Sequence, residues 1–433
     1  MTWLRLAPLT PALSPQAGRG RLFEPSPPSG GEGWVRGLAK RVRCGLAVLL
    51  TWSTPAFAAD LNIGFLGTLS GAQANMAQDQ LDGFQLAVKH LGGRLGGVEF
   101  ALTVLNDRHD PAAAMQAVQH LLQSERVQVL LLSTDPRIGA AVVPAATGGR
   151  TFVLNLNAPA PALAGKECSP YLFSLSGLAE TMHDLAGQYL QAQGYRNLAV
   201  VGPDTAGERD AVAALRRSFK GQVTEIASRR GDMDYSKELN RLRKLAPDGV
   251  YLLYTGGMAV DFLLQSAASG VKKEMPLFGP PTTLDQSLLA AVGQASLDAF
   301  SIGPWSEDLD APANRRLMSD FESEYGRSAS FFAAEGYDAA MLLDAAIRAA
   351  DKKINDDDAL RGALRRVDFP STRGSFHFDT NQFPVQTYFV RQVVQDAREH
   401  MVNELRGLLA KDVRDGHAGE CPMRWTAEPP PKG

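Results

Sequence analysis

Short apolar segments alternate with longer segments of helical periodicity along most of the chain, from about residue 60 to residue 370. Strands that are apolar almost throughout are typical of parallel sheets covered by helices on both faces. The alternation therefore predicts an α/β fold built from doubly wound sheets. The predicted strands cover residues 61–66, 98–106, 127–133, 151–157, 197–202, 221–228, 249–255, 276–279 and 300–304.

The segments between these strands repeat apolar residues every three or four positions, as amphipathic helices do. Asp110 followed by Pro111 is typical of a helix start, because Asp caps free N–H groups and Pro fits the first turn. The segments 375–380 and 386–394 instead predict a β-hairpin, and a helical pattern returns at 395–408. The other predicted helices cover 79–91, 136–147, 178–193, 206–219, 235–245, 258–269, 312–325, 332–351 and 356–366.

The composition is that of an ordinary globular protein. The 433 residues are 45% hydrophobic and 21% charged, with a formal net charge of −3. This length is enough for two or three domains, which favours two α/β domains over one very large sheet. A nucleic-acid-binding protein usually shows a basic face, so we expect no nucleic-acid partner.

The sequence lacks the common motifs of phosphate binding and of nucleophilic hydrolysis. His109 and His183 have no partners at metal-ligand spacing. Ser70 or Ser133 could act as the nucleophile of a hydrolase only with a base, and no recognised motif supplies one. We therefore expect no enzyme activity, no cofactor and no metal.

The N-terminal region has the pattern of an export signal. Residues 36–43 are basic, and 44–52 are apolar but too short to span a bilayer. Ala-Phe-Ala at 56–58 has small residues at the two positions that a signal peptidase reads. The pattern predicts a Sec-type signal peptide at 35–58, cleavage after Ala58 and a periplasmic protein. A buried apolar segment is the alternative.

Two terminal segments are not expected to fold. Residues 1–34 are rich in Pro, Gly and Ser and lack periodicity, so they read as a mis-annotated start or as a disordered extension. The Pro-rich end at 424–433 reads as a disordered tail.

Two cysteines, Cys168 and Cys421, remain after the predicted cleavage. In an oxidising compartment such a pair is a candidate disulfide. It would join the C-terminal extension to the main body; two unpaired thiols are the alternative.

Several segments resemble one protein family in their order and spacing. The most specific is "DMDYSKELNRLRKLAPDGVYLLYTGG" (232–257), in which Asp-Tyr-Ser precedes a helix and an Asp-x-Val strand start follows. The others are "IGFLGTLSG" (63–71), "GGVEFALTVLNDRHDPAAAMQAVQHLL" (96–122), "VQVLLLSTDPRIGAAVVPAA" (127–146), "FFAAEGYDAAMLLDAAI" (331–347) and "RGSFHFD" (373–379). Over about 59–400 the chain resembles type I periplasmic solute-binding proteins of ABC importers, in the branched-chain amino-acid branch.

The resemblance implies two α/β lobes that are joined by three hinge crossovers and close on a ligand. The crossovers are expected near 175–178, 302–306 and 371–375. The expected partners are a small-molecule ligand and an ABC permease of the inner membrane, with the protein itself a monomer. The expected organisation is lobe 1 at 59–176 plus 305–371, lobe 2 at 177–304 plus 372–395, and a C-terminal extension at 396–423.

Ligands of open α/β sheets bind beyond the carboxyl ends of the strands. Small polar groups follow the predicted strands there, and several occupy positions at which the resembled family contacts its ligand. The alternative is that the Ser and Thr residues only cap helices. The expected ligand-binding residues are Ser70, Ser133, Thr134, Asp135, Asn157 and Ala158 in lobe 1, and Tyr254, Thr255, Pro281 and Thr282 in lobe 2.

Two departures from the family pattern bear on the ligand. Amino-acid binders of this branch carry a Thr where this chain has Ala160, and an acid where it has Pro281. A buried ammonium group without a carboxylate partner costs several kcal/mol, which disfavours a free amino acid. Asp135 could still supply that charge.

We therefore expect a small organic acid, with an aromatic acid as one option. Binding of branched-chain or other amino acids or amides, or a role as a ligand-sensing receptor, are the alternatives. Phe65, Tyr254 and Trp305 are candidate aromatic walls of the site, with ordinary core packing as the alternative.

Overall fold

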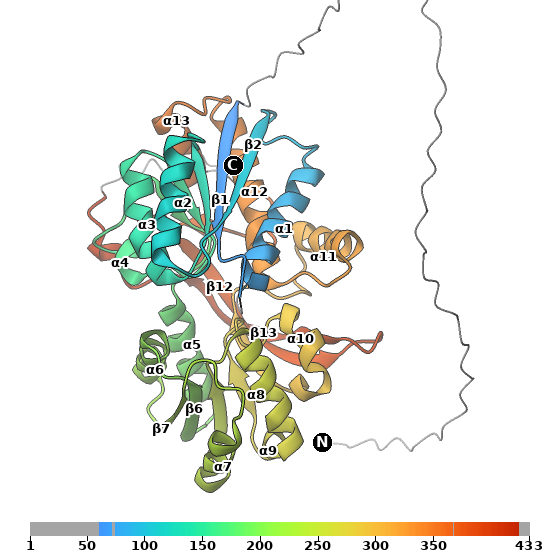
Figure 1. Ribbon diagram of the computed structural model, residues 1–433. Helices are drawn as coiled ribbons and strands as arrows, with labels where there is room; N and C mark the ends of the chain where they lie inside the picture. Colours follow the sequence, from blue (N-terminus) through green and yellow to red (C-terminus); the bar gives the residue numbers. More distant parts are fainter. Residues whose placement is uncertain (1–59, 72–73, 367, 424–433) are drawn as a thin grey trace, which may run out of the picture. The chain divides into compact units, whose positions relative to one another are not determined.

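The computed structural model describes residues 60–71, 74–366 and 368–423 (Figure 1). The predicted signal peptide with its cleavage after Ala58, the extension at 1–34 and the tail at 424–433 lie outside the described residues. Within the described part of the chain, no helix has the length and apolar character needed to cross a membrane.

The first sheet is parallel, with strands in the order β2-β1-β3-β4-β5. Successive side chains of a strand point to opposite faces, so Phe65 packs on one face and Leu66 on the other. The strands are β1 (Leu61–Gly67), β2 (Phe100–Asn106), β3 (Val129–Ser133), β4 (Phe152–Asn155) and β5 (Leu172–Ser174).

Helices cover both faces of this first sheet, and sheet and helices together are called lobe 1 (Figure 1). One face carries α1 (Ala74–His90), α11 (Pro312–Tyr325), α12 (Phe331–Ala349) and α13 (Asp357–Arg366). The other carries α2 (Pro111–Gln123), α3 (Pro136–Gly148) and the short α4 (Pro161–Ala164).

The second sheet is mixed, with the path β11-β12-β10-β9-β8-β6-β7 and β13 paired with β12. The strands from β6 to β10 are parallel, and β12 runs antiparallel to β10. The strands are β6 (Asn197–Pro203), β7 (Gln222–Ser228), β8 (Gly249–Leu252), β9 (Leu277–Gly279), β10 (Phe300–Gly303), β11 (His377–Phe378), β12 (Pro384–Gln395) and β13 (Met401–Val413).

Helices also cover both faces of the parallel part of the second sheet, and together they form lobe 2 (Figure 1). One face carries α5 (Ala179–Ala192) and α6 (Ala206–Ser218). The other carries α7 (Ser236–Leu245), α8 (Gly256–Ser269), α9 (Val271–Glu274) and α10 (Gln286–Val292). The predicted α/β fold with doubly wound sheets is confirmed.

The predicted hairpin is confirmed, because β11 and β12 pair antiparallel. The prediction of a helix at 395–408 is wrong. Met401–Val413 is instead a strand that pairs with β12, and register shifts interrupt their pairing. Such irregularities break the alternation of apolar and polar residues by which a strand is recognised in a sequence.

The chain after α13 returns to lobe 1 before it reaches lobe 2. Phe376 and Phe383 pack in the two cores of lobe 1, and the backbone N–H of Ser174 donates to the carbonyl of Gln382 at 3.1 Å. This packing favours a third crossover within β12, later than the expected 371–375. The lobe boundaries themselves stay predictions.

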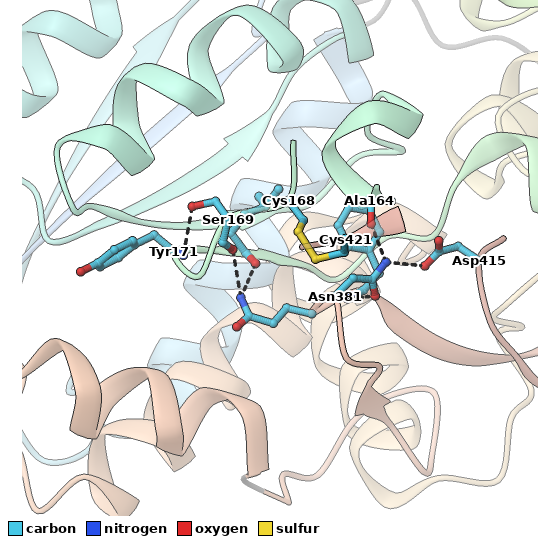
Figure 2. Close-up of a disulfide and its surroundings, with 10 residues drawn as sticks. Ala164, Cys168, Ser169, Tyr171, Asn381, Asp415 and Cys421 are labelled. Carbon is cyan, nitrogen blue, oxygen red and sulfur yellow. Dashed lines mark hydrogen bonds between the residues drawn. A yellow bond between two sulfur atoms is a disulfide. The ribbon is translucent and has the colours of Figure 1, made fainter. Parts of the chain in front are cut away.

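The C-terminal extension runs back along β12 as β13 and ends against lobe 1. Asn381 donates to the carbonyl of Ala164 and to the carboxylate of Asp415, both at 2.9 Å (Figure 2). Beside them Cys168 and Cys421 form the disulfide, with their Cα atoms 5.7 Å apart (Figure 2). The predicted pairing is thus present, and the extension is fixed to lobe 1 covalently.

Candidate ligand-binding site

A cavity of about 200 Å³ lies between the ends of the two sheets. Its walls follow the carboxyl ends of β1, β3 and β4 in lobe 1 and of β8 and β9 in lobe 2, where ligands of α/β sheets bind. The structure brings together at this cavity Ser133, Thr134, Asp135, Asn157, Ala158, Thr255, Pro281 and Thr282. Their contact with a ligand stays a prediction.

Two of the expected ligand-binding residues lie elsewhere. Ser70 is exposed in the loop after β1 and is not part of the cavity wall. Tyr254 is fully buried in lobe 2, where its hydroxyl lies 2.9 Å from that of Ser228 and its ring packs on Tyr235 and Phe262. Side chains alternate along an extended chain, so the neighbouring Thr255 faces the cavity and Tyr254 faces the core.

The other two candidate aromatic walls are also core residues. Phe65 is buried between the sheet and the helices of lobe 1. Trp305 is buried as well, and its indole N–H donates to the side-chain oxygen of Asn314 at 2.7 Å. For both residues the alternative of ordinary core packing is the correct one.

The apolar walls come mainly from residues that are not among the expected ligand-binding residues. They are Met76, Leu178, Met182, Pro304, Phe331 and Phe332. Phe331 and Phe332 begin α12, within a segment matched to the family, so the resemblance could have pointed to them. Leu178 is the N-cap residue of α5, directly after the first crossover, and Met182 lies in the first turn of that helix.

A buried polar chain supports the wall at Ser133. The Ser133 hydroxyl donates to the amide oxygen of Gln80. The amide nitrogen of Gln80 donates to the carbonyl of Leu156 at 2.8 Å and to the carboxyl group of Glu335 at 3.1 Å. Three segments distant in sequence, α1, the end of β3 and α12, therefore meet beneath the cavity.

Two glycines allow this meeting of α1 and α12. A Cβ atom on Gly83 would lie 2.0 Å from the carbonyl oxygen of Ala333, and one on Gly336 would lie 1.8 Å from that of Gln80. Real Cβ atoms do not approach this closely, so both positions require glycine at this helix spacing. The close crossing brings Gln80 within reach of Glu335.

Glu335 is buried beneath the cavity, and this burial raises its pKa to about 8. Arg373 and hydrogen bonds from Ser176 and Gln80 act in the opposite direction, and Asp338 adds to the rise. At neutral pH the carboxyl group is therefore mostly protonated. The floor of the cavity then carries little negative charge at this point.

A second hydroxyl-bearing residue, Thr68, lines the cavity beside Ser133. The backbone N–H of Thr68 donates to the carbonyl of Ser133 at 3.1 Å, so the two residues are neighbours at the sheet end. The Thr68 hydroxyl donates to the buried carboxylate of Asp107 at 3.0 Å. Near the hinge, Tyr388 likewise donates its hydroxyl proton to the amide oxygen of Gln386 at 3.2 Å.

The helices α1, α3 and α12 of lobe 1 and α5 and α8 of lobe 2 begin at the cavity. In α3 and α12 an acidic side chain binds a backbone N–H group of the first turn, in α12 beside the N-cap Ser330. The carboxylate of Asp135 accepts from the backbone N–H of Arg137 at 2.9 Å in the first turn of α3. The backbone N–H of Phe331, the first residue of α12, donates to the carboxylate of Asp285 at 3.3 Å. Asp135 also pairs with the Arg137 guanidinium at 3.2 Å.

The two helices from lobe 2 begin without such caps. The N-cap residues are Leu178 for α5 and Thr255 for α8, and neither side chain makes a capping bond among the described residues. The N-terminus of a helix carries a partial positive charge and backbone N–H groups. The lobe 2 side of the cavity is therefore suited to an anion.

The arrangement suits binding better than catalysis. The partner of Ser133 is an amide oxygen, which cannot take up a proton near neutral pH as a general base must. Among the described residues, no three His, Cys, Asp or Glu side chains gather in a way that could hold a metal ion.

The chain belongs to the periplasmic binding protein family, whose model matches residues 60–398. Membership indicates a periplasmic location. The chain is 23% identical, over 331 residues, to the Leu/Ile/Val/Thr-binding protein of Salmonella typhimurium, an alignment that covers 73% of this chain and 87% of the relative.

Two solved structures also share the fold. One is a solute-binding protein of an ABC transporter from R. palustris in complex with benzoate. It has 28% identity and a TM-score of 0.77, and the match covers 84% of this chain and 99% of that one. The other is an ABC transporter substrate-binding protein from Sphaerobacter thermophilus. It has 27% identity and a TM-score of 0.76, and the match covers 81% and 98% of the two chains.

Proposed function

We propose that this protein is the substrate-binding component of an ABC importer and that it captures a small organic acid, with an aromatic carboxylate such as benzoate as the leading candidate. The observation that carries the proposal is a mainly apolar cavity at which two uncapped helices, α5 and α8, begin. The benzoate-bound relative from R. palustris supports the same class of ligand.

The two ends of an aromatic acid match the two kinds of wall. The ring can pack against Phe331, Phe332, Met76 and Met182, where burial of apolar surface stabilises it. The carboxylate can accept from the first N–H groups of α5 and α8, whose dipoles favour negative charge.

A free amino acid is the second candidate, because the Leu/Ile/Val/Thr-binding relative favours it. Its ammonium group would need an acidic partner. Asp135 is the charged residue among the described residues that line the cavity, and it already caps α3 and pairs with Arg137. Pro281 offers no charge, and Ala160 no hydroxyl, at the two positions where amino-acid binders have them.

The proposed mechanism is capture without chemistry. The ligand binds between the lobes, and it shifts them toward the closed form because it contacts both lobes only there. The protein acts as a monomer exported through the signal peptide at 35–58, and its closed form delivers the ligand to a permease of the inner membrane. A sensing role would use the same closure with a signalling partner.

Isothermal titration and thermal shift of the protein from Ala59 onward test the ligand class. Benzoate, cyclohexanecarboxylate, leucine and valine separate the candidates, and benzamide is the uncharged control for benzoate. A ligand at 100 times its dissociation constant stabilises by about 2.7 kcal/mol, which a thermal shift detects. A shift with benzoate but not with benzamide or leucine supports the proposal.

Two outcomes would contradict it. A strong shift with leucine or valine and none with the acids would establish the amino-acid alternative. Chemical conversion of a bound acid, detected by mass spectrometry of the recovered ligand, would show that the protein is an enzyme. For the transport role, we expect ligand-loaded protein to stimulate ATP hydrolysis by its cognate permease complex.

A further inference from the structure

The direction of the hydrogen bond between Ser133 and Gln80 is fixed by the other partners of the Gln80 amide. The carbonyl of Leu156 can only accept, so the amide nitrogen must face it, at 2.8 Å. The amide oxygen then faces Ser133, and the Ser133 hydroxyl must donate. Its proton points away from the cavity, and its remaining lone pair can face a ligand.

Thr68 is fixed in the same sense. Its hydroxyl donates to the carboxylate of Asp107, which also accepts from the backbone N–H of His109 at 2.8 Å. Thr68 and Ser133 are adjacent through the 3.1 Å backbone bond between β1 and β3. At the lobe 1 end of the cavity, the hydroxyl groups of Ser133 and Thr68 therefore already donate their protons within the protein. Their oxygens are left to accept.

We infer that this pair of oxygens makes the cavity selective for an acid that also carries a hydrogen-bond donor, such as a hydroxybenzoate, with Ser133 and Thr68 accepting from the ring hydroxyl. The inference rests on the proposed function. It orients the ligand with its carboxylate toward α5 and α8 and its hydroxyl toward lobe 1.

The reverse orientation is disfavoured by hydrogen bonding. A carboxylate at Ser133 could be bound only if the hydroxyl turned its proton into the cavity. The amide oxygen of Gln80, which is fully buried, would then lose its donor. An unsatisfied buried acceptor is costly, whereas a ligand hydroxyl requires no such rearrangement.

Gln80 is accordingly a positioning residue, because it acts on the ligand through Ser133. Its own position depends on the close crossing of α1 and α12 at Gly83 and Gly336. Replacement of Gln80 by Met would remove the acceptor and leave the Ser133 proton available to the cavity. The preference should then change from ligand donors toward ligand acceptors.

The test is isothermal titration of the protein from Ala59 onward with benzoate, 3-hydroxybenzoate, 4-hydroxybenzoate and 4-methoxybenzoate. The methoxy compound is the matched control, since an ether oxygen accepts but cannot donate. One net hydrogen bond corresponds to about a tenfold change in affinity. We expect one of the two hydroxybenzoates to bind about tenfold more tightly than benzoate, and the methoxy compound not to share this gain.

The variants test the assigned residues. In Ser133→Ala and in the isosteric Thr68→Val, the ratio of hydroxybenzoate to benzoate affinity should fall. In Gln80→Met, the affinity for 4-methoxybenzoate should rise relative to that for 4-hydroxybenzoate. A general loss of stability would not change this ratio. If Gln80→Met does not fold, as judged by circular dichroism, the other two variants decide.

The outcomes separate this inference from the proposed function. If benzoate or 4-methoxybenzoate binds as tightly as both hydroxybenzoates, the donor preference is wrong while the aromatic-acid proposal stands. The same holds if the affinity ratio is unchanged in Ser133→Ala and Thr68→Val. If no aromatic acid binds, both the donor preference and the aromatic-acid proposal are wrong.

Discussion

The carboxylate of Asp338 lies 3.0 Å from the guanidinium of Arg373, and the two side chains are 0% and 4% exposed. Asp338 also accepts from the Ser371 hydroxyl and the Thr372 backbone N–H, both at 2.7 Å. Arg373 donates to the carbonyl of Leu175 at 2.7 Å. This pair therefore joins α12 to the chain at the first crossover and to the segment after α13.

Replacement of Asp338 by Ala should strongly destabilise the protein, because it leaves Arg373 buried without its partner. Breaking a buried ion pair typically costs about 3–5 kcal/mol of unfolding free energy. Urea denaturation measures the change. The matched control is Glu322→Ala, which removes the exposed pair of Glu322 and Arg398, 3.0 Å apart, and should cost less than about 1 kcal/mol. Equal losses in the two variants would contradict this assignment.

Stability should decrease as the pH rises toward 8, because of two acids, the buried Glu335 and the partly buried Glu307. Burial raises the pKa of Glu307 and of Glu335 from 4.5 to about 8. Between these pH values the folded protein holds protons that the unfolded chain has released. The free energy of unfolding therefore decreases as the pH rises. Thermal unfolding from pH 5 to pH 9 measures this effect. The stability of Glu335→Gln and of Glu307→Gln relative to the wild type should increase with pH. A pH-independent difference would refute the assigned titration.

Removal of the disulfide should destabilise the protein, and loss of both cysteines should cost no more than loss of one. The bond joins residues 253 positions apart, and loss of a native disulfide typically costs about 2–5 kcal/mol. Because one bond is lost in each case, Cys168→Ser, Cys421→Ser and the double variant should have the same stability in guanidinium denaturation. The reduced wild type should match them. Additive losses would show that the two sulfurs contribute separately.

A contact between the lobes should slow ligand release. Arg230, which follows β7 in lobe 2, donates to the Nε2 atom of His109, which follows β2 in lobe 1, at 3.0 Å. The contact is exposed, so its loss should change affinity by no more than about fivefold, or 1 kcal/mol. Stopped-flow dissociation of the ligand from Arg230→Ala should be faster by this amount. Arg229→Ala is the control, because Arg229 pairs with Asp232 of its own lobe.

The sequence predicted the elements of the fold closely where local pattern determines them. The parallel strands are buried on both faces and the helices are amphipathic, so both leave clear periodicities. The predicted helix at 312–325 matches α11, and the observed strand β7, at 222–228, lies within the predicted strand at 221–228. The strand β13 was missed because its partner, β12, and the irregular pairing between them are not visible in its own residues.

The candidate site was predicted less completely, for a different physical reason. Strand ends located the region, and Ser133 and Thr255 do line the cavity. Which side chain of a strand end faces the cavity depends on register, and a shift of one residue exchanges Thr255 for the buried Tyr254. The role of Gln80 depends on a helix crossing between segments more than 250 residues apart, which one sequence does not reveal.

The glycines at that crossing also constrain how this binding site can change in evolution. A substitution at Gly83 or Gly336 would push α1 and α12 apart and withdraw the Gln80 amide from Ser133, although neither glycine lines the cavity. A homologue that has lost either glycine should therefore have a different preferred solute, even if every wall residue is retained. Ligand specificity can therefore change when the distance between the backbones of α1 and α12 changes.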